Sequence, residues 1–475
     1  MASRADGGSP AETAAELRGR IGVAGGVSTI VGYIIGGSIF ILPVTLAGQV
    51  GPGIFLSYLI AAAIALFVCM VSAQIGSAFP MSGGTYVAVS SVVSPFWGFM
   101  VVWMGVLIAF TSTSALAYGL VDHLVPYVPA LAAHRLAGAI ASIAIFTGVN
   151  LLGIRTAVWV QTVLVVVFMA VLVVVGAAGL AHGSLDRFTP LFPIGMGPVL
   201  YAAIPAYYSY SGFSAIVTIG GEIVEPRRNI PRVLGVSFPV IALTYTLLTV
   251  AVPAAVPWQE LRTGEATLTR VASAVLPPGV ELFVGAAALC AIATSINGLL
   301  LAKSRDVFSL ALDRVLPRRL AGVGPFGEPR TSLFFMGSVA ICGVLLQRSF
   351  AEYAAMSVLC VMVVHALQGI VVLRLPQRRP AHFAAAGYRF GAAARWFWGT
   401  GLVLSAVGFI LIGLEGDRVG GVIYLLACGL GAAWYVRRRQ TLRQEGIDID
   451  VLLLAHAAHA VPHPPPPLAR AALNA

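Results

Sequence analysis

The sequence has few charged residues and few cysteines, and each scarcity excludes a class of protein. Only 10% of its 475 residues are Asp, Glu, Lys or Arg, whereas a soluble domain usually has about 25%. All five cysteines lie inside long apolar runs, so we expect no disulfide-linked partner. The sequence shows no Cys/His cluster with metal-ligand spacing, no nucleophile–base pair and no Gly-rich phosphate loop with Lys. It therefore predicts no metal, no cofactor and no catalytic site, and it argues against an enzyme or a primary pump.

Long apolar runs fill the chain instead. Hydrophobic residues make up 58% of it, and a run of about 20 such residues can span a bilayer as a helix. Leu, Ala, Val and Gly fill the runs continuously, whereas a membrane barrel would show alternating segments about half as long. We predict an all-α polytopic membrane protein with about twelve transmembrane helices in contact with membrane lipid. The twelve spans are 21–46, 53–78, 96–121, 137–153, 156–181, 198–221, 233–256, 280–302, 331–347, 354–373, 396–414 and 419–436.

Positive charge concentrates on one side of the predicted membrane. If the N-terminus is inside, all but six of the 29 Lys and Arg residues lie in inner segments or tails. Because the positive side of membrane proteins is cytoplasmic, we predict a multi-pass protein of the cytoplasmic (inner or plasma) membrane with both termini inside. The net charge of +10 then follows from topology. A nucleic-acid partner is not expected, since it would need a basic soluble face.

The predicted spans divide the chain into five parts. Residues 1–20 form a cytoplasmic tail that lacks the apolar core and cleavage site of a signal peptide, so we expect the first span to be retained. A transport core occupies 21–373, and a cytoplasmic loop occupies 374–395. The last two helices lie within 396–436. The tail 437–475 ends in a Pro-rich run and is expected to be disordered.

Two spans are interrupted near their middle by small and polar residues. The first contains Gly36-Gly37-Ser38, and the sixth contains the segment 207–213 after Pro205. Interruptions at corresponding positions are typical of transporters built from inverted repeats, although close helix packing also uses glycine. We predict a 5+5 inverted-repeat core in which helices 1 and 6 are broken.

An unwound segment inside a membrane must direct its free backbone groups at a cavity or a ligand. The N–H groups of Gly37, Ser38 and Ile39 would begin a half-helix and attract a carboxylate. Carbonyl groups of 34–36 and 207–209 would accept hydrogen bonds from an ammonium, so the pair of breaks suits a zwitterion. The candidate substrate-binding residues are Ile35, Gly36, Gly37, Ser38, Ile39, Tyr207, Tyr208, Ser209, Ser211 and Gly212.

Four motifs resemble those of the amino acid–polyamine–organocation permeases. They are Gly36–Phe40 in the first span, Phe79–Tyr86 after the second, Gly221–Arg232 after the sixth, and Ser304-Arg305 with Leu316-Pro317 after the eighth. The resemblance covers about residues 21–436. It implies a secondary active transporter of amino acids that works by alternating access, with its substrate site between spans 1, 3, 6 and 8.

The chain departs from the family pattern at three positions. Ser38 replaces a glycine of the first-span motif, and Ser214 stands where many relatives have Glu. Several relatives have a Lys in span five, whose ammonium stands in for sodium; counting from Gln161, we place that position at Phe168. We expect a neutral zwitterionic substrate and proton-linked or exchange transport. Sodium coupling, cationic amino acids or amines, and a non-transporting membrane sensor are the alternatives.

Several other side chains have both a functional and a structural interpretation. Tyr208 matches an aromatic residue that closes over the substrate in relatives, whereas Tyr207 and Tyr210 are expected to pack. Thr294 and Ser295 are candidates for an ion site that would take H⁺ or Na⁺, although such hydroxyls usually bond a carbonyl of their own helix.

Ionisable residues within and beside the spans remain. His365 is either a functional group inside the membrane or, as we expect, a neutral His with one helix-to-helix hydrogen bond. The residues after spans six and eight form either an ion-pair gate at the inner mouth or a solvated loop stem. They are Glu222, Glu225, Arg227, Arg228, Lys303 and Arg305.

Overall fold

The computed structural model describes residues 20–449 except 126, 263–266, 349 and 417, and the elements in this part of the chain are helices. Eight of the described helices are long and apolar enough to cross a membrane. The protein is therefore a multi-pass helical membrane protein, as the sequence predicts. The tail residues 1–19 and 450–475 lie outside the described part of the chain.

Each predicted span coincides with one helix or with two consecutive helices. Spans one to five are α2 (Val23–Ile35) with α3 (Ser38–Val50), α4 (Ile54–Ala78), α6 (Pro95–Leu124), α7 (Arg135–Leu151) and α8 (Ile154–His182). Spans six to ten are α9 (Met196–Tyr208) with α10 (Ala215–Thr218), α11 (Pro226–Ala255), α13 (Val280–Leu312), α14 (Arg330–Val344) and α15 (Phe350–Arg378). The last two are α17 (Ala392–Gly416) and α18 (Arg418–Gln444). The fourth and ninth spans, α7 and α14, are shorter apolar helices.

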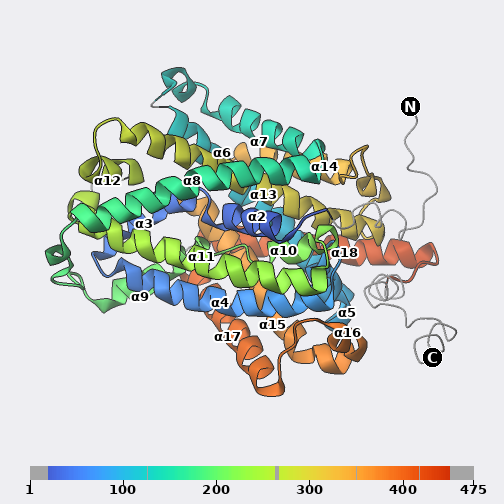
Figure 1. The fold of residues 1–475 in the computed structure, drawn as a ribbon. Helices are drawn as coiled ribbons and strands as arrows, with labels where there is room; N and C mark the ends of the chain where they lie inside the picture. Colours follow the sequence, from blue (N-terminus) through green and yellow to red (C-terminus); the bar gives the residue numbers. More distant parts are fainter. Residues whose placement is uncertain (1–19, 126, 263–266, 349, 417, 450–475) are drawn as a thin grey trace, which may run out of the picture.

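Short helices lie in the connections. They are α5 (Gly84–Val92), α12 (Leu268–Val275), α16 (Pro380–Ala385), and the 3₁₀ turns η1 (Pro129–Ala132), η2 (Leu185–Phe188), η3 (Gly220–Glu222), η4 (Glu260–Arg262) and η5 (Arg318–Ala321). In Figure 1, α12 lies at the left end of the bundle, and α5 and α16 lie at the right end. The connections predicted to be outside (257–279) and inside (374–395) are thus at opposite ends.

Two helices extend past the predicted spans. Helix α18 continues to Gln444, through the basic cluster at 437–439. Helix α15 extends to Arg378, past the predicted end of its span at 373. Arg side chains can keep their charge in the headgroup region while the backbone stays helical, so a basic cluster does not by itself end a helix.

The first interrupted span, the α2–α3 pair, lies in the interior of the bundle. In the most apolar stretch of each span, 83% of residues are buried for α13 and 78% for the α2–α3 pair, against 22% for α17. The α2 helix packs against α8, α11 and α13. The interior position keeps the irregular backbone of the break away from lipid, which could not satisfy its polar groups.

The first break is where the sequence predicts it. Helix α2 ends at Ile35 and α3 begins at Ser38. Gly36 between them has φ +33°, in the left-handed region that favours glycine. A Cβ atom at Gly36 would also collide with Oγ of Ser295 on α13. Backbone conformation and close packing therefore both require glycine here.

The second break lies between Tyr208, the last residue of α9, and Ala215, the first of α10. Gly212 within it has φ +143°, and a Cβ atom there would collide with the ring of Tyr33 on α2. The two breaks therefore approach each other directly.

Candidate substrate site

A cavity of about 60 Å³ lies where the two breaks meet, and α6, α13 and α15 complete its walls. The predicted site residues that line it are Ser38, Tyr208, Ser211, Gly212 and Ser295. Ser214, which stands in place of the family Glu, also lines it. The structure thus brings residues from three separated segments of the sequence to one space.

The other candidate residues lie beside this cavity without lining it. Tyr207 packs its ring against His365 and Phe409, at centroid distances of 6.2 and 5.3 Å. The hydroxyl of Ser209 pairs with that of Tyr58 at 3.3 Å. Both side chains therefore pack behind the residues that line the cavity.

Within the first break, Ile35, Gly36, Gly37 and Ile39 are buried. A Cβ atom at Gly37 would collide with Ile292 of α13. Gly37 therefore has a packing role in addition to its predicted place at the start of α3.

The hydroxyls of Thr294 and Ser295 reach the carbonyl groups of α2, as an ion site would require. Thr294 Oγ1 lies 3.0 Å from the carbonyl oxygen of Gly32, and Ser295 Oγ lies 3.2 Å from that of Tyr33. Thr294 Oγ1 is also 2.7 Å from the carbonyl of Ala291 in its own helix. The contacts with α2 fit an ion site, and the contact of Thr294 with Ala291 fits a hydroxyl that bonds a carbonyl of its own helix.

Tyr245 of α11 closes the first break from the other side, and the sequence analysis missed it. Its hydroxyl lies 3.2 Å from the carbonyl of Ile35, 3.4 Å from that of Ile34 and 3.1 Å from Ser38 Oγ. Two of the carbonyls expected to accept from a substrate ammonium thus have a protein partner. The ring of Tyr210 packs against Tyr245 at 4.9 Å, in the packing role predicted for Tyr210. A single Tyr in an apolar span gives no sequence signal that its hydroxyl contacts the backbone of another helix.

The α8 residue beside Gly32 of α2 is Gln161, whereas Phe168 is the position predicted to match the family Lys. A Cβ atom at Gly32 would meet Nε2 of Gln161, and Val165 is the next α8 residue in reach. Phe168 lies seven residues beyond Gln161, about two helical turns away. Residues seven apart lie on one face of a helix, so Gln161 and Phe168 differ in their height along α8 and not in the face that they occupy.

A chain of amide hydrogen bonds orients Gln161. Asn150 Nδ2 donates to Asn297 Oδ1 at 2.8 Å, and Asn297 Nδ2 donates to Gln161 Oε1, also at 2.8 Å. Because the oxygen of Gln161 is engaged, its Nε2 group is directed at Gly32. This nitrogen is buried and has no hydrogen-bond partner among the described residues. The first break therefore faces an N–H donor on α8.

His365 on α15 lines the cavity, but its hydrogen bond differs from the predicted one. Nδ1 lies 3.0 Å from Gln368 Oε1 in the same helix, so the expected helix-to-helix bond is wrong. Gln368 Nε2 in turn lies 3.4 Å from Thr85 Oγ1 of α5 and makes the connection between helices. Nε2 of His365 is buried without a partner among the described residues.

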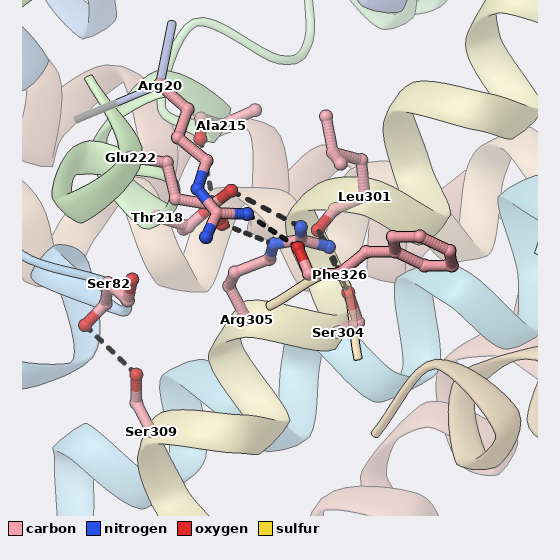
Figure 2. A network of polar contacts seen from close by, with 10 residues as sticks. All are labelled: Arg20, Ser82, Ala215, Thr218, Glu222, Leu301, Ser304, Arg305, Ser309 and Phe326. Atoms are coloured by element: carbon pink, nitrogen blue, oxygen red, sulfur yellow. Dashed lines mark hydrogen bonds and ion pairs between the residues drawn. The ribbon is translucent and has the colours of Figure 1, made fainter. Parts of the chain in front are cut away.

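One end of the bundle is closed by a buried ion pair. Arg305 Nε lies 2.7 Å from Glu222 Oε1, and the two side chains are 0% and 1% exposed. The main-chain N–H of Arg20 donates to the carbonyl of Glu222 at 2.8 Å, and its guanidinium donates to the carbonyl of Phe326 at 2.5 Å. Figure 2 shows these residues as one cluster, with the contact of Ser309 with Ser82 beside it.

The remaining ionisable residues at this end do not join that cluster. Lys303 pairs with Asp306 at 3.3 Å. The guanidinium of Arg227 donates to the carbonyl of Ala385 at 2.7 Å. Glu222 and Arg305 are thus the two predicted gate residues whose ion pair with each other is seen in the described part of the chain.

The motifs, the two breaks and the cavity between them point to one family, and comparison with known proteins decides it. The family described as "Amino acid permease" matches residues 23–433. The chain belongs to this family. The permease is 32% identical over 337 residues to an uncharacterized transporter of Mycobacterium tuberculosis (strain CDC 1551 / Oshkosh), which covers 70% of this chain and 74% of the relative.

Three relatives of the permease have names that state a substrate or a substrate class, and two of the three are named for amino acids. The Asc-type amino acid transporter 1 of Mus musculus is 28% identical, covering 64% of this chain and 60% of the relative. The branched-chain amino acid permease of Bacillus subtilis is 24% identical, covering 66% and 72%. A methylthioribose transporter of the same bacterium is also 24% identical, covering 72% and 78%. The permease is a transporter and not an enzyme.

Proposed function

We propose that the permease is a secondary active transporter that carries neutral zwitterionic amino acids across the cytoplasmic membrane by alternating access. The observation that supports this most is that the two helix breaks face one cavity. Helix α3 has no side-chain cap at its N-cap residue, Gly37. Its N-terminus therefore offers N–H groups and a positive partial charge to a carboxylate. The relatives named for amino acids support the same substrate class.

The lining of the cavity favours a neutral substrate over a cationic one. Ser214, at the position where many relatives have Glu, places a hydroxyl where a carboxylate would be needed to bind a cation. Among the described residues that line the cavity there is no Asp or Glu. A cationic amino acid or polyamine would have to leave its charge unpaired in a buried site, which is costly.

For coupling, we propose proton-linked or exchange transport in preference to sodium coupling. A sodium ion between Gly32, Thr294 and Ser295 would need oxygen ligands. The two hydroxyls lie within hydrogen-bond distance of the Gly32 carbonyl, and Gln161 directs an N–H donor at the same segment. An amide N–H group cannot ligate a cation, so it makes this position less favourable for sodium than another oxygen would.

For orientation, we propose that both termini are cytoplasmic and that the Arg305–Glu222 pair closes the cytoplasmic end. Tyr208 would close over the bound substrate from the α9 side of the cavity. A non-transporting sensor remains the alternative of another class. Uptake of a substrate against its gradient by the purified protein would exclude it.

The test is an uptake panel with the purified permease in liposomes, with sodium and proton gradients imposed separately. The panel contains neutral, cationic and acidic amino acids, a polyamine and methylthioribose. Ser214→Leu should abolish uptake because it fills a cavity of only about 60 Å³. Ser338→Leu is the matched control, since Ser338 is exposed on α14 and bonds only the Phe334 carbonyl of its own helix. Normal uptake by the Ser214 variant would refute the site, and the absence of any amino acid uptake by the wild type would refute the function.

A further inference from the structure

Among the described residues that line the cavity, Lys303 is the one Lys, Arg, Asp or Glu. Lys303 of α13 is the only lysine in the sequence, and it lines the cavity. Its Nζ lies 3.3 Å from Oδ2 of Asp306, one helical turn further on. The Lys303 side chain is 13% exposed and that of Asp306 is 2% exposed. The pair therefore turns its ammonium, and not its carboxylate, toward the cavity.

The position of Lys303 along α13 defines a second end of the substrate site. Lys303 follows Ser295 by eight residues, or about 12 Å along the helix axis. Leu299, midway between them, also lines the cavity. Ser295, Leu299 and Lys303 are spaced four residues apart, so they lie on one face of α13, and all three line the cavity that also reaches the breaks. A substrate whose α-amino and α-carboxyl groups lie at the breaks therefore extends its own side chain toward the ammonium.

The charges of Lys303 and Asp306 limit which substrate side chains can bind here. Lys303 and Asp306 together are neutral, and Asp306 Oδ1 is buried without a partner among the described residues. A substrate carboxylate would add a net negative charge to this buried pair, and a substrate cation would face the ammonium directly. Both are unfavourable where water is scarce. A neutral oxygen acceptor takes a charge-assisted hydrogen bond from Nζ and leaves the balance unchanged.

The wall opposite α13 is compatible with a polar side chain. Ser112 of α6 and Ser357 of α15 line the cavity, and their hydroxyls lie 2.7 Å apart. We propose that Lys303 is a specificity-determining residue that donates a hydrogen bond to a neutral acceptor on the substrate's side chain. The preferred substrates are then amino acids with a carboxamide side chain. This inference depends on the proposed amino acid transport.

The test compares binding of glutamine, norleucine and glutamate to the purified permease. Glutamine and norleucine have unbranched side chains of similar length, but only glutamine carries an acceptor. The wild type should bind glutamine about tenfold more tightly than norleucine, as expected for a hydrogen bond to a charged group, and more tightly than glutamate. Lys303→Met with Asp306→Asn should bring the glutamine-to-norleucine ratio close to one. The double variant is used because Lys303→Met alone would leave a buried carboxylate uncompensated.

Asp306→Asn alone tests the charge-balance argument. It keeps the ammonium and removes its counter-charge, so the preference should move toward glutamate. A double variant that keeps the glutamine preference would overturn the role of Lys303, and so would a wild type that binds norleucine equally well. A wild type that prefers glutamate would overturn the neutral-acceptor assignment. In all three cases amino acid binding itself persists, so the proposed function stands, whereas a wild type that binds and transports no amino acid refutes both.

Discussion

Replacing Glu222 by Gln should destabilise the permease strongly, because the change leaves the guanidinium of Arg305 buried without its carboxylate. Nε of Arg305 lies 2.7 Å and Nη2 lies 3.4 Å from the carboxylate oxygens of Glu222, so the contact is bidentate. The remaining acceptors, the Leu301 carbonyl at 3.1 Å and Ser304 Oγ at 3.0 Å, are neutral. Breaking a buried pair by removing one partner costs about 3–5 kcal/mol.

An exposed pair in the same protein provides the matched control. Arg135 and Asp122 also approach to 2.7 Å in a bidentate contact, but their side chains are 52% and 46% exposed. Asp122→Asn should therefore cost only about 0.2–1 kcal/mol. The two substitutions remove the same kind of charge at the same distance and differ mainly in burial.

The measurement is thermal unfolding of each purified variant in detergent, with Glu222→Gln/Arg305→Met as a third protein. The double variant leaves no unpaired charge, so it should recover much of the stability that Glu222→Gln loses. Equal midpoints for Glu222→Gln and Asp122→Asn would refute the reasoning, since burial would then make no difference. A double variant less stable than Glu222→Gln would show that the loss comes from packing and not from an uncompensated charge.

Three further predictions concern coupling, closure and topology. Gln161→Glu should make uptake sodium-stimulated, because an acceptor replaces the donor that faces Gly32; unchanged uptake with and without sodium would contradict this. Tyr208→Ala should weaken substrate binding more than Tyr208→Phe, measured as Kd, since a closing ring acts mainly through its apolar face; equal effects would count against closure. A cysteine at Leu320, in a variant without the five native cysteines, should react with an impermeant label only from the cytoplasmic side; labelling of intact cells would reverse the topology.

The fold was largely predictable because its signals are local. Each apolar run forms a helix, and the segments 36–38 and 209–214, which contain glycine and serine, form the breaks. A bilayer forces this outcome, since each backbone polar group must be satisfied within its own segment. The basic clusters did not mark the ends of α15 and α18. An arginine at the headgroups is compatible with a continuing helix, so its position does not mark a helix end.

The candidate site was predictable where it depends on backbone breaks and not where it depends on which helix faces meet. The sequence alone determined the class of protein and the broken helices, and it singled out Ser38, Tyr208 and Ser295, which line the cavity. Only the tertiary structure decided that Tyr245 closes the first break and that Gln161 faces Gly32. The sequence likewise placed Lys303 among gate residues, whereas helix packing turns its ammonium into the cavity. Spacing along one helix does not determine which of its faces meets a helix distant in sequence, because that contact is settled by packing of the whole bundle.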